Sequence, residues 1–293
     1  MAVSADGICR VRTLCKRLSL GEALFLLVRV AVPLLKKVGG RIKEKLAFLK
    51  KSCYNGVMRV FAIGDLHLST TSDKPMDIFG GGWENHFEKI KKDWLEKVSE
   101  EDVVLIAGDV SWAMKLVDAV EDLKQLQCLP GRKIFVRGNH DYWWNGIGKI
   151  RASAPDESYA FLQTDALKIG DMVLVGSRGW TCPGSPDFSE QDEKLYQREA
   201  ARFRLAFADA RRLMEEGDKL VVLMHYPPFS VKNGETEFTR LFEENGVSAV
   251  VFGHIHGSSY FPLRTERNGI AYYLTACDKA NFTLTEIRIA LKK

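Results

Sequence analysis

The sequence lacks the cysteine patterns of several protein classes. Its six cysteines are scattered and include no Cys-x-x-Cys pair, which argues against a thiolate zinc site and against a dense disulfide framework. We therefore expect free thiols in a reducing compartment, and from this a cytoplasmic protein. No internal repeat or low-complexity tract is visible in the 293 residues, and the composition is that of an ordinary globular protein.

The sequence also lacks a clean membrane-spanning run. The most apolar segment, residues 18–40, is interrupted by Glu22, Arg29 and Pro33, whereas a span needs about 20 apolar residues. No small-residue cleavage pattern of a secretory signal follows it. Residues 1–57 carry 12 Lys and Arg against 3 Asp and Glu, so we interpret them as a basic N-terminal extension.

Three interpretations of residues 1–57 stay open. The segment could be a basic amphipathic helix that contacts an anionic membrane or a partner protein. It could be a helix packed on the main domain. Alternatively, Met58 could be the natural start, because the first strand-like run begins there.

The body of the protein, residues 58–293, has a small net negative charge. It carries 30 Lys and Arg against 35 Asp and Glu, and it has no basic run near its polar motifs. A nucleic-acid-binding groove needs such a run, so this composition argues against a nucleic acid as partner.

Apolar strand-like runs alternate with amphipathic helical stretches along the body. Strands are expected at 58–64, 102–108, 133–138, 171–177, 219–225, 248–254, 270–276 and 281–291. Helical periodicity predicts helices at 84–98, 115–127 and 190–217. This alternation predicts an α/β fold with layered sheets and helices outside.

Polar side chains follow five of these strands directly. Five of the six histidines stand in these strand-end segments: Asp65-Leu66-His67, Asp109, Asn139-His140-Asp141, His225 and His254-Ile255-His256. Because ligands collect beyond the carboxyl ends of strands in α/β sheets, we expect the five segments to meet in one crevice. His86 lies in a predicted helix, and we interpret it as a surface or core residue.

Imidazole, carboxylate and amide groups without thiolates suit Mn, Fe or Zn. The segments hold too many such groups for one tetrahedral site, whereas two ions that share a bridging carboxylate would use them all. Two divalent ions about 3.5–4 Å apart are the arrangement of many phosphatases and nucleases.

The body resembles the calcineurin-like metallophosphoesterases of the bacterial type. The resemblance rests on Asp-x-His at 65–67, Gly-Asp at 108–109, Gly-Asn-His-Asp at 138–141, a separate His225 and Gly-His-x-His at 253–256. It implies a four-layer α/β/β/α sandwich and two divalent metal ions. By motif, the first ion would be held by Asp65, His67, Asp109 and His256, and the second by Asp109, Asn139, His225 and His254. A hydroxide between the ions would attack phosphorus, and His140 would protonate the leaving oxygen or stabilise the transition state.

The sequence departs from the family pattern at Trp112. Many relatives carry a carboxylate at this position, which orients the catalytic histidine, so His140 must be oriented by another group here. Asp141 is interpreted as a supporting residue. Arg178 is a candidate for binding a substrate phosphate through its guanidinium, whereas Arg137 is expected to form a structural salt bridge.

Four functions follow from this reading. The leading one is a phosphohydrolase that cleaves a small phosphomonoester or phosphodiester. The alternatives are a membrane-associated pyrophosphate hydrolase of a lipid-linked substrate, which would use residues 1–57, a metal-dependent nuclease, and a catalytically silent binding scaffold. The filled ligand positions disfavour the scaffold, and the acidic body disfavours the nuclease. Trp143, Trp144, Trp180 and Tyr226 fit either an aromatic rim of the site or packing beneath loops.

Overall fold

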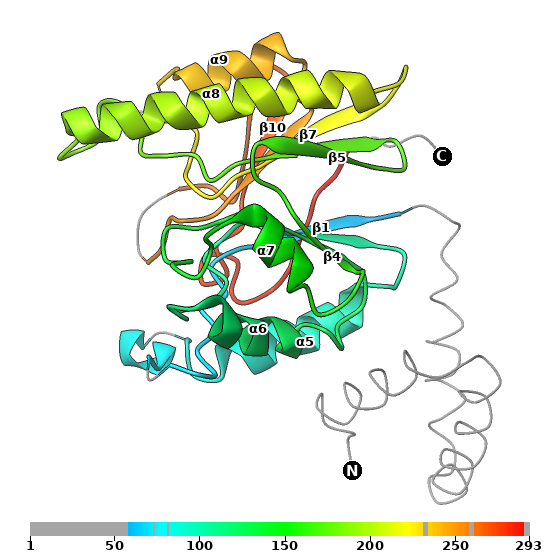
Figure 1. Ribbon diagram of the computed structural model, residues 1–293, viewed down its shortest axis with the longest axis vertical. Coiled ribbons are helices and arrows are strands. Elements are labelled where there is room, and N and C mark those ends of the chain that lie inside the picture. The colour runs from blue at the N-terminus through cyan, green and yellow to red at the C-terminus, as the bar shows by residue number, and fades with distance from the viewer. Residues whose placement is uncertain (1–57, 73, 81, 231–233, 258–260, 290–293) are drawn as a thin grey trace, which may run out of the picture.

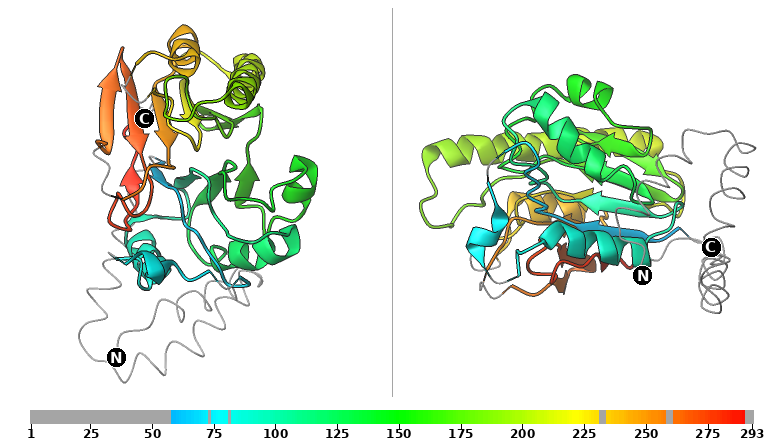
Figure 2. Two further views of the ribbon diagram at one scale, coloured as in Figure 1. Left: turned by 90° about the vertical axis from the view of Figure 1, so that its left-hand side faces the viewer. Right: turned by 90° about the horizontal axis from the view of Figure 1, so that it is seen from below.

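The computed structural model describes residues 58–289 apart from 73, 81, 231–233 and 258–260. The described chain forms two β-sheets that face each other, with helices on both outer faces (Figures 1 and 2). This arrangement confirms the predicted α/β sandwich. The predictions for residues 1–57 lie outside the described residues. No helix in the described part of the chain is long and apolar enough to cross a membrane.

The first sheet has five strands. Their order is β11 (Thr285–Glu286), β1 (Val60–Ile63), β2 (Val103–Ile106), β3 (Arg132–Phe135) and β4 (Tyr159–Phe161). All neighbours pair in parallel except β11, which is antiparallel to β1. The helices α5 (His86–Lys97), α6 (Leu116–Gln125) and α7 (Ile147–Ala152) accompany this sheet, and the 3₁₀ helix η2 (Met76–Phe79) precedes α5.

The second sheet has six strands. Their order is β5 (Asp165–Ile169), β6 (Met172–Gly176), β7 (Lys219–Leu223), β8 (Ala249–Phe252), β10 (Ile270–Leu274) and β9 (Arg264–Arg267). Strands β6, β7, β8 and β10 run parallel, and the two edge strands are antiparallel to their neighbours. The helices α8 (Glu190–Leu213) and α9 (Glu237–Glu244) cover the outer face of this sheet (Figure 1).

The alternation of side chains along β1 shows how the layers form. All four residues of β1 are buried: Val60 and Ala62 pack between the two sheets, while Phe61 and Ile63 pack toward the helices. A strand covered on both faces needs apolar residues at every position, which explains the continuous apolar runs in the sequence. Burial of Val60, Phe61 and Ile63 contributes about 1.5–3 kcal/mol each to folding.

Helix α8 begins at a capping box. Ser189 Oγ accepts a hydrogen bond from the backbone N–H of Asp192, and the Asp192 carboxylate accepts one from the backbone N–H of Ser189. Two of the free N–H groups at the start of the helix are thereby satisfied. The predicted helix at 190–217 is therefore confirmed, and it ends four residues earlier than expected.

The thiol prediction is confirmed at two cysteines. Cys182 and Cys277 are buried free thiols.

The carboxyl ends of the strands from the two sheets interlock. The His254 backbone N–H, just after β8, donates to the Asp65 carboxylate, just after β1, over 3.1 Å. The His225 ring Nδ1, after β7, lies 2.8 Å from the Ala107 carbonyl oxygen, after β2. Gly138 has no room for a side chain, because a Cβ there would lie 2.0 Å from Asp109 Oδ1. The fold therefore brings the strand-end segments into contact.

Candidate metal centre

The five predicted strand-end segments converge at this interlocked edge. Two groups of candidate ligand atoms form there, each with its atoms within 4.8 Å of one another. The first group is Asp65, His67 and His256, and the second is Asp65, Asp109 and His225.

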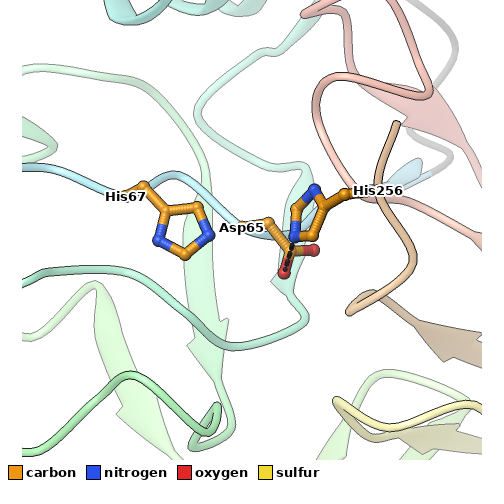
Figure 3. Close-up of side chains that lie close together, drawn as sticks. All are labelled: Asp65, His67 and His256. Atoms are coloured by element: carbon orange, nitrogen blue, oxygen red, sulfur yellow. Dashed lines mark ion pairs between the residues drawn. The ribbon is translucent and has the colours of Figure 1, made fainter. Parts of the chain in front are cut away.

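The first group lies at the ends of β1 and β8. His256 Nε2 is 3.2 Å from Asp65 Oδ1, and the three side chains lie close together (Figure 3). His67 Nε2 is 3.9 Å from Asp109 Oδ2, and His67 Nδ1 is buried without a hydrogen-bond partner. A buried polar atom without a partner is costly unless a missing group satisfies it.

Beside the second group, Asn139 and His254 bring further acceptor atoms unusually close to His225. The His225 Nδ1–H donates to the Ala107 carbonyl oxygen, so the lone pair of His225 Nε2 faces Asn139 Oδ1 at 2.6 Å. His254 Nδ1 is 2.8 Å from the same oxygen and 3.2 Å from His225 Nε2. Two lone pairs at this distance repel each other unless a cation lies beside them. The donor set therefore fits a divalent metal ion.

The two carboxylates Asp65 and Asp109 face both groups. Asp109 Oδ2 is 3.9 Å from His67 Nε2 and 3.5 Å from His225 Nε2. Asp65 Oδ1 is 3.2 Å from His256 Nε2 and 4.0 Å from His225 Nδ1. Asp109 is therefore close to a histidine nitrogen with a free lone pair in each group, which is the position of a carboxylate that two ions could share.

Several of these residues adopt the left-handed backbone region. The φ angles are 59° at Asp65, 46° at His67, 50° at Asp109 and 71° at His254. Non-glycine residues in this region cost free energy, and they cluster at functional sites.

Burial sets the charge of the histidines. It lowers the pKa of His67, His225 and His254 to about 3 each, so all three are neutral at pH 7 and can offer a lone pair. Burial raises the pKa of Asp109 well above its usual value, and the neighbouring Asp141 and Asp65 carboxylates add to this. A cation would relieve this repulsion.

His256 is the exception, and its partner Asp278 was missed in the sequence. Burial alone would lower the pKa of His256, but hydrogen bonds to Asp278 and Asp65 raise it to about 10. Asp278 Oδ1 accepts from His256 Nδ1 at 2.8 Å, which leaves Nε2 aimed at Asp65. A carboxylate that fixes a ring in this way is typical of metal-binding histidines. The sequence feature that could have indicated Asp278 is the end of strand β10, which lies four residues before it.

Asp141 has the supporting position expected of it. It is fully buried, and its carboxylate accepts hydrogen bonds from the backbone N–H groups of Asp109, Val110, Ser111 and Gly138 and from the Trp143 indole. Asp141 therefore ties the loop after β2 to the loop after β3.

A sequence profile of the calcineurin-like phosphoesterases matches residues 58–258, which include all five strand-end segments. The chain belongs to the calcineurin-like phosphoesterase family. This confirms the family inferred from the motifs and, at the level of the family, the enzyme class, a metal-dependent phosphoesterase.

This calcineurin-like phosphoesterase is similar to tartrate-resistant acid phosphatase type 5 of Oryctolagus cuniculus, at 26% identity over 153 residues. The match covers 47% of this chain and 46% of that protein, so the chain spans about half the length of this curated relative. Among solved structures, TT1561 of Thermus thermophilus matches with 11% identity and a TM-score of 0.49 over 79% of this chain and 99% of that one. The protein of unknown function AQ665 from Aquifex aeolicus matches with 15% identity and a TM-score of 0.41, over 78% and 96%.

His140 has an aromatic neighbour where many calcineurin-like phosphoesterases have a carboxylate. The Trp112 ring centroid is 4.5 Å from that of His140 and 4.8 Å from that of His67, against which it stacks. The His140 backbone N–H donates to Asp109 Oδ1 over 2.8 Å. Ring packing and this backbone bond therefore position His140.

The remaining predicted residues divide between the site and the core. Trp143 and Trp144 are fully buried, which supports packing rather than a rim. The ring centroid of Tyr226 is 4.2 Å from that of His254, and the ring centroid of Trp180 is 5.1 Å from that of Tyr226. Both ring nitrogens of His86 face backbone carbonyl oxygens, as a structural residue would.

Proposed function

We propose that the protein is a phosphohydrolase that uses two divalent metal ions, Mn, Fe or Zn, to cleave a small phosphomonoester or phosphodiester. The observation that carries this proposal is the close approach of His225 Nε2 and Asn139 Oδ1 beside two buried carboxylates. Such a set of acceptors suits cations, and the family supplies the phosphoester chemistry.

The ligand residues divide between the ions as follows. One ion would be held by Asp65, His67, Asp109 and His256, and the other by Asp109, Asn139, His225 and His254. The ions, when bound, would supply Lewis-acid activation of the phosphoryl group and of the attacking water. Distances of 3.9 and 3.5 Å from Asp109 Oδ2 to a histidine of each set support Asp109 as the shared ligand.

Two residues outside the ligand set would handle the substrate. Burial lowers the pKa of His140, so its ring is neutral at pH 7 and would donate one hydrogen bond to the leaving oxygen. Arg178 lies beside the second set, since its carbonyl oxygen accepts from the His225 backbone N–H over 3.1 Å. Its guanidinium would bind a phosphate group of the substrate.

The test is manganese-dependent hydrolysis of p-nitrophenyl phosphate and of bis-p-nitrophenyl phosphate by the full chain. We expect turnover of at least one ester and a loss of about 10³-fold or more in Asp109→Asn, because transition-state stabilisation through the ions would be lost. The ratio of the two rates distinguishes a monoesterase from a diesterase. Glu96→Gln on the exposed face of α5 makes the same carboxylate-to-amide change outside the site and is the matched control.

Two results would defeat the proposal. One is no manganese-dependent turnover of either ester by folded wild-type protein. The other is equal turnover by Asp109→Asn and wild type.

A further inference from the structure

The paired strand ends form a row, and the metal centre occupies only part of it. The first pair joins β1 and β8 through Asp65 and the His254 N–H. The second pair joins β2 and β7 through Ala107 and His225. The next neighbours in the two sheets are β3 and β6. They also touch, because a Cβ added to Gly176 at the end of β6 would lie 2.8 Å from Val136, just after β3.

An arginine follows each strand of this third pair. Arg137 comes directly after Val136, and Arg178 comes two residues after Gly176. Both arginines are half-buried, and the Nε of each is buried without a hydrogen-bond partner. Neither guanidinium has a hydrogen bond or ion pair with any of the described residues. The expected structural salt bridge of Arg137 is therefore wrong for this part of the chain.

No carboxylate among the described residues is bound to either arginine, and the contact of Gly176 with Val136 places the two arginine segments side by side. The nearby Glu199 carboxylate is bonded to Arg202 and to Ser177 instead, at 2.7 Å each. Two like charges held together without a bound carboxylate form a site for an anion.

Arg178 is held in a fixed position beside the metal centre. Its guanidinium lies over the Trp180 ring at 4.3 Å from the centroid. Its carbonyl oxygen accepts hydrogen bonds from the backbone N–H groups of His225 and Tyr226, each at 3.1 Å. The position of Arg178 is therefore fixed relative to His225, a candidate metal ligand. A side chain that contacts the substrate needs such preorganisation.

We propose that Arg137 and Arg178 together form an anion subsite that binds a second anionic group of the substrate, next to the phosphate held at the metal centre. The inference rests on the proposed phosphohydrolase function. It names the substrate class as a phosphoester with a phosphate or carboxylate close to the scissile group.

A third arginine shows that an unbonded Nε alone does not make a subsite. The Nε of Arg132 is also buried without a partner, but Arg132 begins β3 and lies at the opposite end of that strand from the metal centre. Arg132→Gln is therefore the matched control, since it removes the same group from the same strand.

The test compares substrates that differ in one anionic group. 3-Phosphoglycerate is paired with glycerol 3-phosphate, and fructose 1,6-bisphosphate is paired with fructose 6-phosphate. We expect wild-type protein to show a higher kcat/KM for the doubly anionic member of at least one pair, and the pair that responds tells carboxylate from phosphate. Arg137→Gln and Arg178→Gln should each reduce this ratio about 10- to 100-fold, mainly through KM, as expected for a lost charge-assisted hydrogen bond.

Arg132→Gln should leave the ratio within about twofold of wild type, because it contacts neither anion. A wild-type ratio near one for both pairs, or a ratio that both subsite variants leave unchanged, would overturn the inference. Thermal unfolding of each variant verifies that it is folded.

A binding measurement separates this inference from the proposed function. Calorimetry with inorganic pyrophosphate on chelator-treated protein should show binding to wild type and to Asp109→Asn, and binding about 10-fold or more weaker in the Arg137→Gln/Arg178→Gln double variant. Equal binding, or no binding to wild type, defeats the subsite even if hydrolysis occurs. Normal binding without hydrolysis of any ester defeats the phosphohydrolase and leaves the subsite standing.

Discussion

Replacing Asp141 with asparagine tests how the two loops that carry Asp109 and Asn139 are held together. One carboxylate oxygen of Asp141 accepts from Val110, Ser111 and the Trp143 indole, at 2.9, 3.2 and 3.0 Å. The other accepts from the backbone N–H groups of Asp109 and Gly138, at 2.9 and 2.7 Å. An asparagine can keep only one oxygen, so its NH₂ group must face N–H donors that were bonded to the other.

The cost follows from the number of donors left without an acceptor. If the amide oxygen replaces the first oxygen, the N–H groups of Asp109 and Gly138 lose their acceptor. Each buried donor left unbonded costs about 1–3 kcal/mol, so Asp141→Asn should lower the free energy of unfolding by about 2–6 kcal/mol. Urea unfolding of chelator-treated protein, followed by tryptophan fluorescence, measures the change.

Asp122→Asn is the matched comparison. Asp122 is equally buried, and its carboxylate accepts from the Thr70 backbone N–H and from the Ser111 hydroxyl. An asparagine there can still accept from Thr70, and its NH₂ group can donate to the hydroxyl, so its cost should stay near about 1 kcal/mol. A loss below about 1 kcal/mol for Asp141→Asn, or equal losses for the two variants, would refute the reasoning.

Three further predictions concern the site. Asp278→Asn removes the carboxylate that holds His256 Nδ1 at 2.8 Å, and it should weaken manganese binding about 10- to 100-fold by calorimetry; unchanged affinity would contradict this role. His67 and His225 have pKa values of about 3 in the folded protein, below the unfolded value near 6.5. The free energy of unfolding of chelator-treated protein should therefore be highest above pH 6.5, and it should fall by up to about 1.4 kcal/mol per histidine per pH unit as the pH drops toward 3. Urea midpoints that stay flat between pH 6.5 and 4.5 would show otherwise. Trp112→Leu removes the ring packed on His140 at 4.5 Å and should lower kcat on p-nitrophenyl phosphate about 10-fold or more, with little change in KM; an equal rise in KM would indicate a different role.

The sequence predicted a structural feature correctly where that feature depended on a single strand or helix. Continuous apolar runs such as β1 predicted strands covered on both faces, and the packing of Val60 and Phe61 on opposite faces confirms this. The polar residues after strands of the same sheet were expected to meet, because parallel strands end at one edge of a sheet. The segments after β7 and β8 belong to the second sheet, and they join the others where the two sheets meet. The last predicted strand, 281–291, was too long, since only Thr285 and Glu286 pair with β1.

Contacts between two segments that are distant in the sequence could not be predicted from the sequence pattern. Asp278 contacts His256 from 22 residues away, and a single aspartate in a loop carries no pattern. The contact of Trp112 with His140 depends on how two loops fold against each other. Arg137 was assigned a salt bridge from strand alternation, which holds inside a strand but not in the loop after β3.

The central claim is that two divalent ions share one buried carboxylate at the interlocked strand ends. Anomalous scattering from crystals of the full chain grown with manganese tests it most directly. We expect two peaks about 3.5–4 Å apart, one beside His67 and His256 and one beside Asn139, His225 and His254, with Asp109 touching both. One peak, or two peaks with Asp109 bound to neither, would contradict it.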